Sequence, residues 1–231
     1  MILALETATA ACSVALASAD GDLLAERVEL EGPAHTRVLL RQVHEVLEEA
    51  GAAAADVGTV LVGLGPGAFT GLRIGVATAR GLALAGDARL GGVPSLTALA
   101  LALAASPEGQ TADRFVPLID ARRREVFAAG YERDNGGVRA CTPLAAVPSA
   151  DLEAYLEQSP GAVVGGDGAV LYAERLPRSA VVAGAVVAPT AAMVVAAWLA
   201  GAEDRREGPA AVLPVYGREP DAVRWHERRP S

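Results

Sequence analysis

The period of apolar positions changes from two to 3.6 residues within the first fifty residues of the chain. Short apolar or alternating runs predict three antiparallel strands at the start. They lie at Ile2–Glu6, Cys12–Ala17 and Leu23–Leu30, with a turn at Asp20-Gly21-Asp22. From His35 to Ala50 the apolar residues instead fall on one arc of a helix, which Gly51 ends. The chain is therefore expected to open with a strand meander that leads into an amphipathic helix.

Strands and helices are expected to alternate after this first helix. Apolar runs predict strands at Val57–Leu64 and Leu90–Val93, and helical patterns run from Thr70 to Ala85 and from Ser95 to Ala105. The polar stretch Ser106–Asp113, which contains proline and glycine, then indicates a domain boundary. We therefore predict a first domain over residues 1–105 and a second over residues 106–231.

The second domain repeats the opening pattern of the first. Its predicted strands are Phe115–Ala121, Glu125–Tyr131 and a third that follows a hairpin turn at Asp134–Gly137. The later elements are a helix at Asp151–Gln158, a strand and turn at Ala162–Gly168, a strand at Val181–Val187 and a helix from Thr190 to Ala200. The proline-rich tail from Gly208 onward is expected to be irregular. Two such units predict a duplicated α/β fold, the ground plan of actin-like ATPase and ribonuclease H-like domains.

Composition restricts the chemistry more than it restricts the fold. Alanine fills about 50 of the 231 positions, and all 20 basic residues are arginine. The absence of lysine excludes Schiff-base catalysis, a lysine general base and a Walker-type phosphate site. The net charge of −8 argues against tight nucleic-acid binding by this chain alone. Two cysteines and the lack of a long uninterrupted apolar run predict a soluble, cytoplasmic protein without a membrane span.

A glycine-rich loop from Gly63 to Gly75 joins a buried strand to the start of the second helix. Free N–H groups at a helix N-terminus favour an anion. The spacing fits neither a Walker A loop nor the dinucleotide-binding fingerprint, because Pro66 interrupts the pattern and no lysine follows. The other interpretation is that the glycines only permit a sharp strand-to-helix turn.

The second helix is apolar or small in almost every direction. Its one polar strip is Arg73 with Arg80, and a small-residue ridge runs along Gly71, Gly75 and Ala79. A helix that is apolar all round must be covered on more than one side. Two interpretations follow: the sheet and first helix cover it from within, or a partner protein completes the coverage with Arg73 and Arg80 at the rim.

Six stretches of the chain, in order and correctly spaced, resemble the TsaB (YeaZ) family. They are Ile2–Leu16, His35-Thr36, Gly65–Gly75, Ile119–Arg122 with Glu125-Val126, Gly165–Gly168 and Pro214–Arg218. One position departs from the family pattern, since Glu6 stands where TsaB-like sequences usually have aspartate. The resemblance therefore extends from the first residues almost to the tail.

The resemblance implies a non-catalytic scaffold rather than an enzyme. TsaB proteins support TsaD, which transfers threonylcarbamoyl to the adenosine beside the anticodon of tRNAs that read codons beginning with A. The implied partners are TsaD directly, with TsaE and tRNA only within the complex, and a homodimer when TsaD is absent. TsaB binds TsaD through its first two helices. On this chain the implied interface residues are His35, Val38, Leu39, Gln42, Arg73, Val76, Ala77, Arg80 and Leu84.

The resemblance implies no catalytic residue and no metal site. TsaD holds its metal with a His-x-x-x-His pair, and Ser95 and Leu99 stand at the matching positions here. His35, His44 and His226 form no helical metal pair. The competing hypothesis is an actin-fold ATPase or carbamoyl transferase that uses the inter-domain cleft. A stand-alone metallopeptidase lacks every motif that it would need.

Two groups of polar residues each leave two interpretations open. One interpretation is a vestigial nucleotide site of weak affinity, formed by Glu6, Thr7, Asp120, Gly165 and Gly166. The other is that the carboxylates of Glu6 and Asp120 only stabilise their hairpins, as a remnant of the fold. No other cofactor is implied. Two arginine clusters are either solvated surface or contribute to tRNA docking within a complex. They are Arg122–Arg124 at a hairpin turn and Arg224, Arg228 and Arg229 in the tail.

Overall fold

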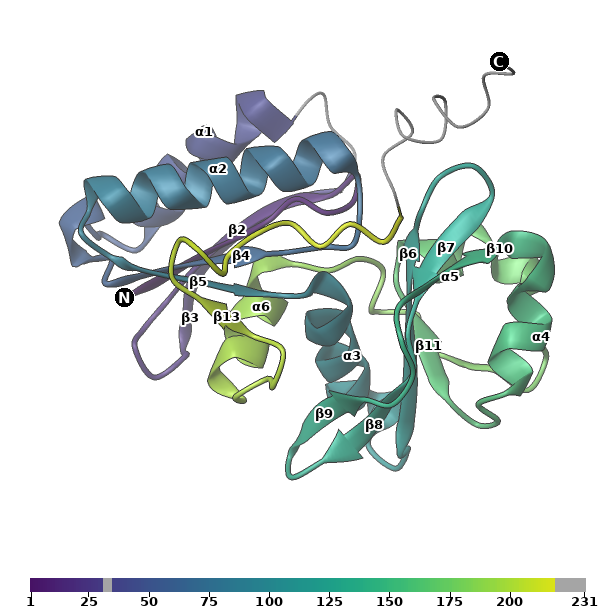
Figure 1. Ribbon diagram of the computed structural model, residues 1–231. Coiled ribbons are helices and arrows are strands. Elements are labelled where there is room, and N and C mark those ends of the chain that lie inside the picture. The colour runs from purple at the N-terminus through teal and green to yellow at the C-terminus, as the bar shows by residue number, and fades with distance from the viewer. Residues whose placement is uncertain (31–34, 219–231) are drawn as a thin grey trace, which may run out of the picture.

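The computed structural model describes residues 1–30 and 35–218, with the backbone alone for residues 35–37. Two β-sheets with helices on their faces make up the described chain (Figure 1). The first sheet has six strands in the order β13-β5-β4-β1-β2-β3. Their bounds are β1 Ile2–Glu6, β2 Cys12–Ala17, β3 Leu23–Glu29, β4 Thr59–Gly63, β5 Arg89–Val93 and β13 Arg206–Glu207.

The second sheet has seven strands, five of them in the order β10-β7-β6-β11-β12. Their bounds are β6 Arg114–Asp120, β7 Glu125–Ala128, β8 Tyr131–Asp134, β9 Gly137–Ala140, β10 Ala145–Pro148, β11 Val163–Gly165 and β12 Val181–Val182. The helices are α1 His35–Glu49, α2 Phe69–Ala85, α3 Ser95–Ala105, α4 Leu152–Glu157, α5 Asp167–Leu171 and α6 Ala191–Leu199.

The two sheets share one strand topology. In the first, β1–β2 and β2–β3 are antiparallel, whereas β1–β4 and β4–β5 are parallel. In the second, β6–β7 and β7–β10 are antiparallel, whereas β6–β11 and β11–β12 are parallel. Each unit therefore has three antiparallel strands followed by two parallel ones, which confirms the predicted duplicated α/β fold of the actin-like type.

The predicted single strand over Glu125–Tyr131 is wrong, because the chain breaks between β7 and β8. Opposite this break lies Pro117, which has no N–H to donate to a ladder. Gly130 turns its backbone toward another loop, donating to Thr142 Oγ1 and accepting from Cys141 N. The third strand of the repeat is consequently β10, and the β8–β9 hairpin around the predicted turn is an insertion.

Two further differences concern the end of the second unit. The predicted strand Val181–Val187 shortens to β12, because Val186 N donates back to Ala183 O and turns the chain. Helix α5 had no counterpart in the sequence prediction, since five residues are too few to show a helical period.

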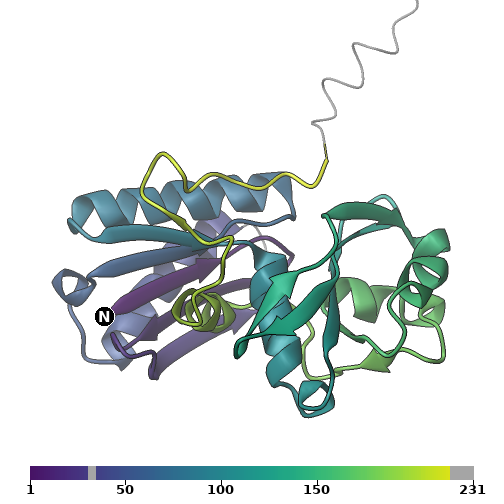
Figure 2. The same ribbon diagram turned by 60° about the horizontal axis from the view of Figure 1, so that its bottom comes forward.

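Helices α1 and α2 lie side by side on one face of the first sheet, and α6 covers the opposite face (Figures 1 and 2). One apolar core fills the space under α1 and α2, and a second lies between α6 and the sheet. Helix α3 packs against both α6 and β6 and so connects the two units. The division at residue 106 stays a prediction, but α6 and β13 follow that boundary and pack on the first sheet.

The last described residues, 208–218, form an irregular segment that we call the C-terminal strap. Its first part lies along the first unit, where Gly208 N donates to Leu90 O and Val215 N donates to Leu64 O. Its end reaches the second unit, where the Arg218 guanidinium donates to Ala121 O. The strap, yellow in Figures 1 and 2, therefore joins both units. Among the described residues no helix is long and apolar enough to cross a membrane.

Candidate functional site

The small-residue ridge of α2 is covered from within the chain. Gly71, Gly75 and Ala79 are buried, and Thr7 Oγ1 donates to Gly71 O at 2.9 Å. A Cβ atom added at Gly75 would lie 2.2 Å from Thr7 Oγ1. The ridge therefore lets the β1–β2 loop approach α2 closely, and for this side of the helix the structure favours coverage from within.

The outward side of α2 carries exposed apolar residues, and the described part of α1 adds one exposed leucine beside the charged side chains of Arg41, His44 and Glu48. Leu84 is 86% exposed and Leu40 of α1 is 58% exposed. Two further residues of α2, Ala77 and Gly81, are also exposed. Phe69, the first residue of α2, is 43% exposed. We call this set, Leu40, Phe69, Ala77, Gly81 and Leu84, the α1–α2 face. A buried leucine side chain gains about 2 kcal/mol over an exposed one, so this face favours a covering partner.

Four residues of the predicted interface are not on this face. Val38, Leu39, Gln42 and Val76 are at most 7% exposed, so they belong to the chain's own core. Gln42 Nε2 donates to Cys12 O, which holds α1 against β2. A helical wheel identifies an apolar side but does not tell the side that meets the sheet from the side that meets a partner. The side chain of His35 lies outside the described residues.

The two arginines placed at the interface rim bind the C-terminal strap instead. Arg80 donates to Pro209 O at 2.6 Å and to Val212 O at 2.9 Å. The Arg73 Nε donates to the Tyr216 hydroxyl at 3.1 Å, and its guanidinium stacks 3.7 Å above the Phe69 ring. Their polar strip therefore fastens the strap along α2, with Tyr216 beside the exposed Phe69.

An apolar groove of about 440 Å³ opens between the C-terminal halves of α1 and α2. Val43 and Leu47 line it from α1, Leu82 and Ala85 from α2, and Leu3 from the sheet below. Because Ala85 lies one helical turn after the exposed Gly81, the groove adjoins the α1–α2 face. It offers space for apolar side chains of a partner.

Glu6 is buried and fully occupied by contacts within the chain. Its Oε1 accepts from Thr7 N and Ala8 N at 2.8 Å each, and its Oε2 accepts from Ser95 Oγ at 2.7 Å. Burial raises the pKa of this carboxyl group, and the three hydrogen bonds oppose that rise. These hydrogen bonds tie the Glu6 carboxylate to its own hairpin loop and to the start of α3.

The glycine loop packs directly on the same hairpin loop. Ala68 N donates to Ala8 O, and a Cβ atom at Gly67 would lie 2.0 Å from Ala8 O. Gly65 N donates to Ser95 Oγ. These glycines are therefore required for close contact between two loops, which favours the interpretation of a sharp turn over that of an anion cradle.

Asp167 is a buried carboxylate beside Asp120, and its charge adds a minor part to the raised pKa of Glu6. Asp120 N donates to Asp167 Oδ1 at 3.1 Å, so the ends of β6 and β11 meet there. Burial first, and then the charge of Asp120, raises the pKa of Asp167 to about 6. Sequence reasoning missed Asp167, although it stands inside the Gly165–Gly168 stretch that carries the resemblance.

Gly165 and Gly166 are closely packed, and the backbone N–H of Gly166 is already bonded. A Cβ atom at Gly166, where φ is +109°, would lie 2.3 Å from Leu118 O. One at Gly165 would lie 2.6 Å from the Leu103 side chain. Gly166 N already donates to Val186 O. Both glycines are accounted for by packing against β6 and α3.

The loop between β6 and β7, residues 121–124, has an unusual backbone, and we call it the arginine loop. Arg122, Arg123 and Arg124 have φ values of 61°, 56° and 63°, and all three side chains are exposed. Left-handed backbone costs a residue other than glycine about 1–2 kcal/mol. Asp120 accepts from Arg122 N and pairs with its guanidinium at 3.3 Å. The predicted tail arginines Arg224, Arg228 and Arg229 lie outside the described residues.

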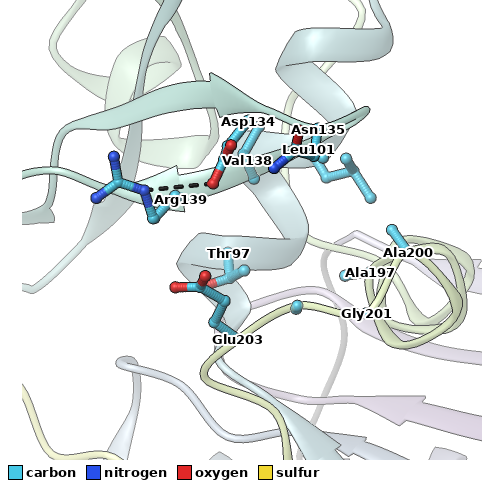
Figure 3. Close-up of a pocket in the computed structure, with 12 residues that line it drawn as sticks. Thr97, Leu101, Asp134, Asn135, Val138, Arg139, Ala197, Ala200, Gly201 and Glu203 are labelled. Carbon is cyan, nitrogen blue, oxygen red and sulfur yellow. Dashed lines mark ion pairs between the residues drawn. The ribbon is translucent and has the colours of Figure 1, made fainter.

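A small polar pocket of about 140 Å³ lies where α3, the β8–β9 hairpin and the end of α6 meet (Figure 3). On one wall Thr97 Oγ1 donates to Asp204 Oδ2 at 2.6 Å, and Thr97 also lies 3.0 Å from the Tyr131 hydroxyl. The side chains of the pocket belong to three distant segments, so the sequence offered no local signal for it.

Comparison with known proteins places this geometry in a family. The sequence model of the family described as "TsaD: tRNA N6-adenosine threonylcarbamoyltransferase" matches residues 29–197. The solved structure of YeaZ from Pseudomonas aeruginosa superposes with a TM-score of 0.75 at 33% identity, over 93% of this chain and 98% of that one. The chain belongs to the TsaB (YeaZ) family.

Two sequence relatives show the extent of the TsaB match. The "tRNA threonylcarbamoyladenosine biosynthesis protein TsaB" of Escherichia coli is 42% identical over 137 residues, which are 59% of this chain and 57% of that protein. An uncharacterized protein of Mycobacterium tuberculosis is 35% identical over 225 residues, 96% of this chain and 93% of that protein. The match thus spans little more than half of the Escherichia coli relative.

The TsaB resemblance inferred from sequence is confirmed, and the structure explains two of the positions that separate this chain from the TsaD pattern. Ser95 donates to Glu6, and Leu99 is fully buried in the core that connects the two units. Over residues 1–30 and 35–218, no group of three or more histidine, cysteine, aspartate or glutamate side chains is arranged to hold a metal ion.

Proposed function

We propose that this chain is the non-catalytic partner of a TsaD-type threonylcarbamoyltransferase in tRNA threonylcarbamoyladenosine biosynthesis. The observation that carries the proposal is the α1–α2 face, an exposed apolar surface that adjoins the groove beside Leu82 and Ala85. The names of the TsaB relatives supply the pathway. The chain acts in the cytoplasm, with TsaE and tRNA joining only in the assembled complex.

The α1–α2 face binds TsaD and pairs two copies of the chain when TsaD is absent. Leu84 and Leu40 supply the apolar contacts, and Ala77 and Gly81 allow close approach of a facing helix. The strap leaves Leu84 exposed while it occupies Arg73 and Arg80. The contact is therefore expected on the outward side of the helix pair rather than at the two arginines.

The enzyme alternative, an ATPase or carbamoyl transferase, would need a charged group free to act between the hairpin loops. Glu6 accepts three hydrogen bonds from its own chain, and Gly67 is packed on Ala8. These contacts leave the first loop closed to a phosphate. We therefore favour a supporting role, with nucleotide affinity weak at most.

Reconstitution with the TsaC, TsaD and TsaE proteins of the same organism tests the proposal. We expect tRNA modification with this chain present and little without it. Equal modification without the chain would show that it is not required, and the proposal would be wrong.

Substitution on the α1–α2 face tests the mode of binding. Leu84→Arg and Ala77→Arg should weaken association with TsaD at least about tenfold, because burying an unpaired charge costs more than 1.4 kcal/mol. Thermal unfolding should stay near wild type, since both side chains are exposed. Leu171→Arg, at a leucine of α5 that is 58% exposed, is the matched control and should bind normally.

A further inference from the structure

We propose that the C-terminal strap is a latch that holds the second unit against the first, and that a partner on the α1–α2 face stabilises the latched state. The strap starts beside Leu90 of β5, follows α2, and ends at Ala121 in the loop between β6 and β7. It therefore links the helix pair of one unit to the hairpin of the other. The kind of partner, a TsaD-type protein, rests on the proposed function, whereas the latch itself does not.

The first-unit end of the strap is anchored in the core under α1 and α2. Val212 is fully buried in that core, and Val215 packs against it. The backbone is fixed as well, because Gly208 N donates to Leu90 O at 2.8 Å and Val215 N donates to Leu64 O at 2.7 Å. Withdrawing Val212 would expose apolar surface to water, which is unfavourable. This end of the strap consequently stays on the first unit.

The second-unit end is held through Gly217 and Arg218. The Arg218 guanidinium donates to Ala121 O at 2.8 Å, pairs with Glu125, and lies 5.6 Å from the centre of the Phe127 ring, within cation–π range. A Cβ atom added at Gly217 would collide with the same ring, which is buried in the core that connects the units. Neither strap residue has an apolar side chain to bury, so this end opens more readily than the first.

Tyr216 connects the latch to the α1–α2 face. Its ring centre lies 5.1 Å from that of Phe69, a member of the face, and its hydroxyl accepts from Arg73 Nε at 3.1 Å. Even when extended, the two residue steps from Tyr216 to Arg218 span at most about 7 Å. Releasing Arg218 therefore removes a restraint on Tyr216, and holding Tyr216 keeps Arg218 close to its acceptors.

Partner binding and latch closure should favour each other for this reason. Phe69 and Tyr216 are 43% and 40% exposed and lie together at the start of α2. A partner that packs along α2 and covers both rings binds the latched arrangement better, because Tyr216 is held in place there. By thermodynamic linkage, the latch then raises the affinity for the partner by the same factor by which the partner favours the latch.

Opening of the latch is a hinge motion. Helix α3 packs against both α6 and β6, and it joins the units at a different place from the strap (Figures 1 and 2). With α3 still in contact with both units, release of the strap turns the second unit about α3 instead of separating it.

The test measures the distance between the units by double electron–electron resonance in the full-length chain. Spin labels are attached at Asp20→Cys in the first unit and Glu157→Cys in the second, both at exposed positions. The exposed Cys141 is replaced in a Cys141→Ser background, while Cys12 is buried and does not take up label. The Kd for the TsaD protein of the same organism is measured in parallel.

Two variants open the latch by different means. Arg218→Ala removes the contacts to Ala121 and Glu125, whereas Gly217→Ala keeps that charge and places a methyl group against the Phe127 ring. Arg139→Ala is the matched control, because the ion pairs of this exposed arginine lie within the β8–β9 hairpin. Thermal unfolding checks that every variant is folded.

We expect both latch variants to shift the distance distribution to longer values, to broaden it, and to raise the Kd for TsaD about fivefold, at the lower end of usual coupling between sites. Adding TsaD should return the distances of Arg218→Ala to those of the wild type. The Arg139 variant should change neither quantity. Unchanged distances in both folded latch variants would overturn the latch, and longer distances with an unchanged Kd would overturn its link to the partner.

Failure of the proposed function gives a different result. If the wild-type chain does not bind TsaD and tRNA modification proceeds without it, the proposed function is wrong. The distance distributions of the chain alone then still decide whether the strap holds the units together. If TsaD binds the wild type and both latch variants equally well at wild-type distances, only the latch is wrong.

Discussion

The two units of the chain share a strand order but differ in the helices attached to it. In the first, α1 has 15 residues and α2 has 17, and together they cover one face of the sheet. The corresponding helices of the second, α4 and α5, have 6 and 5 residues. Over the described residues, a pair of long helices therefore covers a sheet face in the first unit alone.

The hairpin loops differ in the opposite sense. In the first unit Glu6 is 1% exposed and holds its own loop, which the glycine loop and Ser95 close off. In the second, Asp120 is only partly buried and the adjoining loop carries three exposed arginines. In the first unit the hairpin loop is packed inside the chain and the two helices form an exposed surface. In the second unit the hairpin loop is exposed and charged.

The largest expected effect is a difference in stability loss between substitutions of Glu6 and Asp120, the carboxylates that end the equivalent strands β1 and β6. Glu6→Ala should lower the free energy of unfolding by about 3–4 kcal/mol, because two buried N–H groups and the Ser95 hydroxyl lose their acceptor. Asp120→Ala should cost about 1 kcal/mol, since its partner Arg122 is exposed. Urea unfolding of both variants measures the difference.

Glu6→Gln serves as the control for this comparison. The amide keeps an oxygen for Thr7 N and Ala8 N and removes a charge whose burial is unfavourable. It should therefore be far milder than Glu6→Ala. Equal losses at Glu6 and Asp120 would mean that the two units are not differentiated at their hairpins.

The next effect is a pH dependence that Asp167 confers on the second unit. Its pKa is raised from 3.8 to about 6 when folded, so the unfolded chain releases this proton first as pH rises. The free energy of unfolding of the wild type should fall by about 3 kcal/mol as pH rises between these two values. Asp167→Asn should remove that fall, because an amide oxygen still accepts from Asp120 N.

Thermal unfolding of the wild type and the Asp167→Asn variant across pH 4–7 measures this change in stability with pH. The Asp167→Asn variant should match wild type at the acid end and exceed it at neutral pH. Glu6 also has a raised pKa, but it is present in both proteins, so only its coupling to the charge of Asp167 enters the difference. Parallel curves would place Asp167 in solvent and contradict its burial.

The positions of five strands of the first sheet followed from sequence, because each is a separate apolar or alternating run, whereas β13 was not predicted. The same reasoning misassigned the third strand of the second unit. The Asn135-Gly136 turn indicated a strand that in the structure belongs to the inserted β8–β9 hairpin. Asn135 and Gly136 do have the positive φ values that such a turn needs. The turn predicted from these two residues was therefore correct. The pairing between β7 and β10, however, depends on contacts between segments that no local sequence pattern contains.

The candidate interface shows the same limit. A helical period identified α1 and α2 but could not separate Val76, which meets the sheet, from Ala77, which meets solvent. Arg73 and Arg80 were assigned to a rim because the strap that binds them is more than 120 residues away in sequence. Asp167 was missed for a similar reason, since its neighbours come from the end of β6.

The smallest expected effect concerns the backbone of the arginine loop. Arg124→Gly should raise the free energy of unfolding by about 0.5–1 kcal/mol, because relief of left-handed strain exceeds the added entropy of glycine in the unfolded chain. The melting temperature should rise by about 2 °C in a chain of this length. Arg114→Gly should have the opposite sign, since β6 is ordinary strand backbone there. A loss of stability in both variants would show that the left-handed turn is relaxed, and that the arginine loop stores no backbone strain.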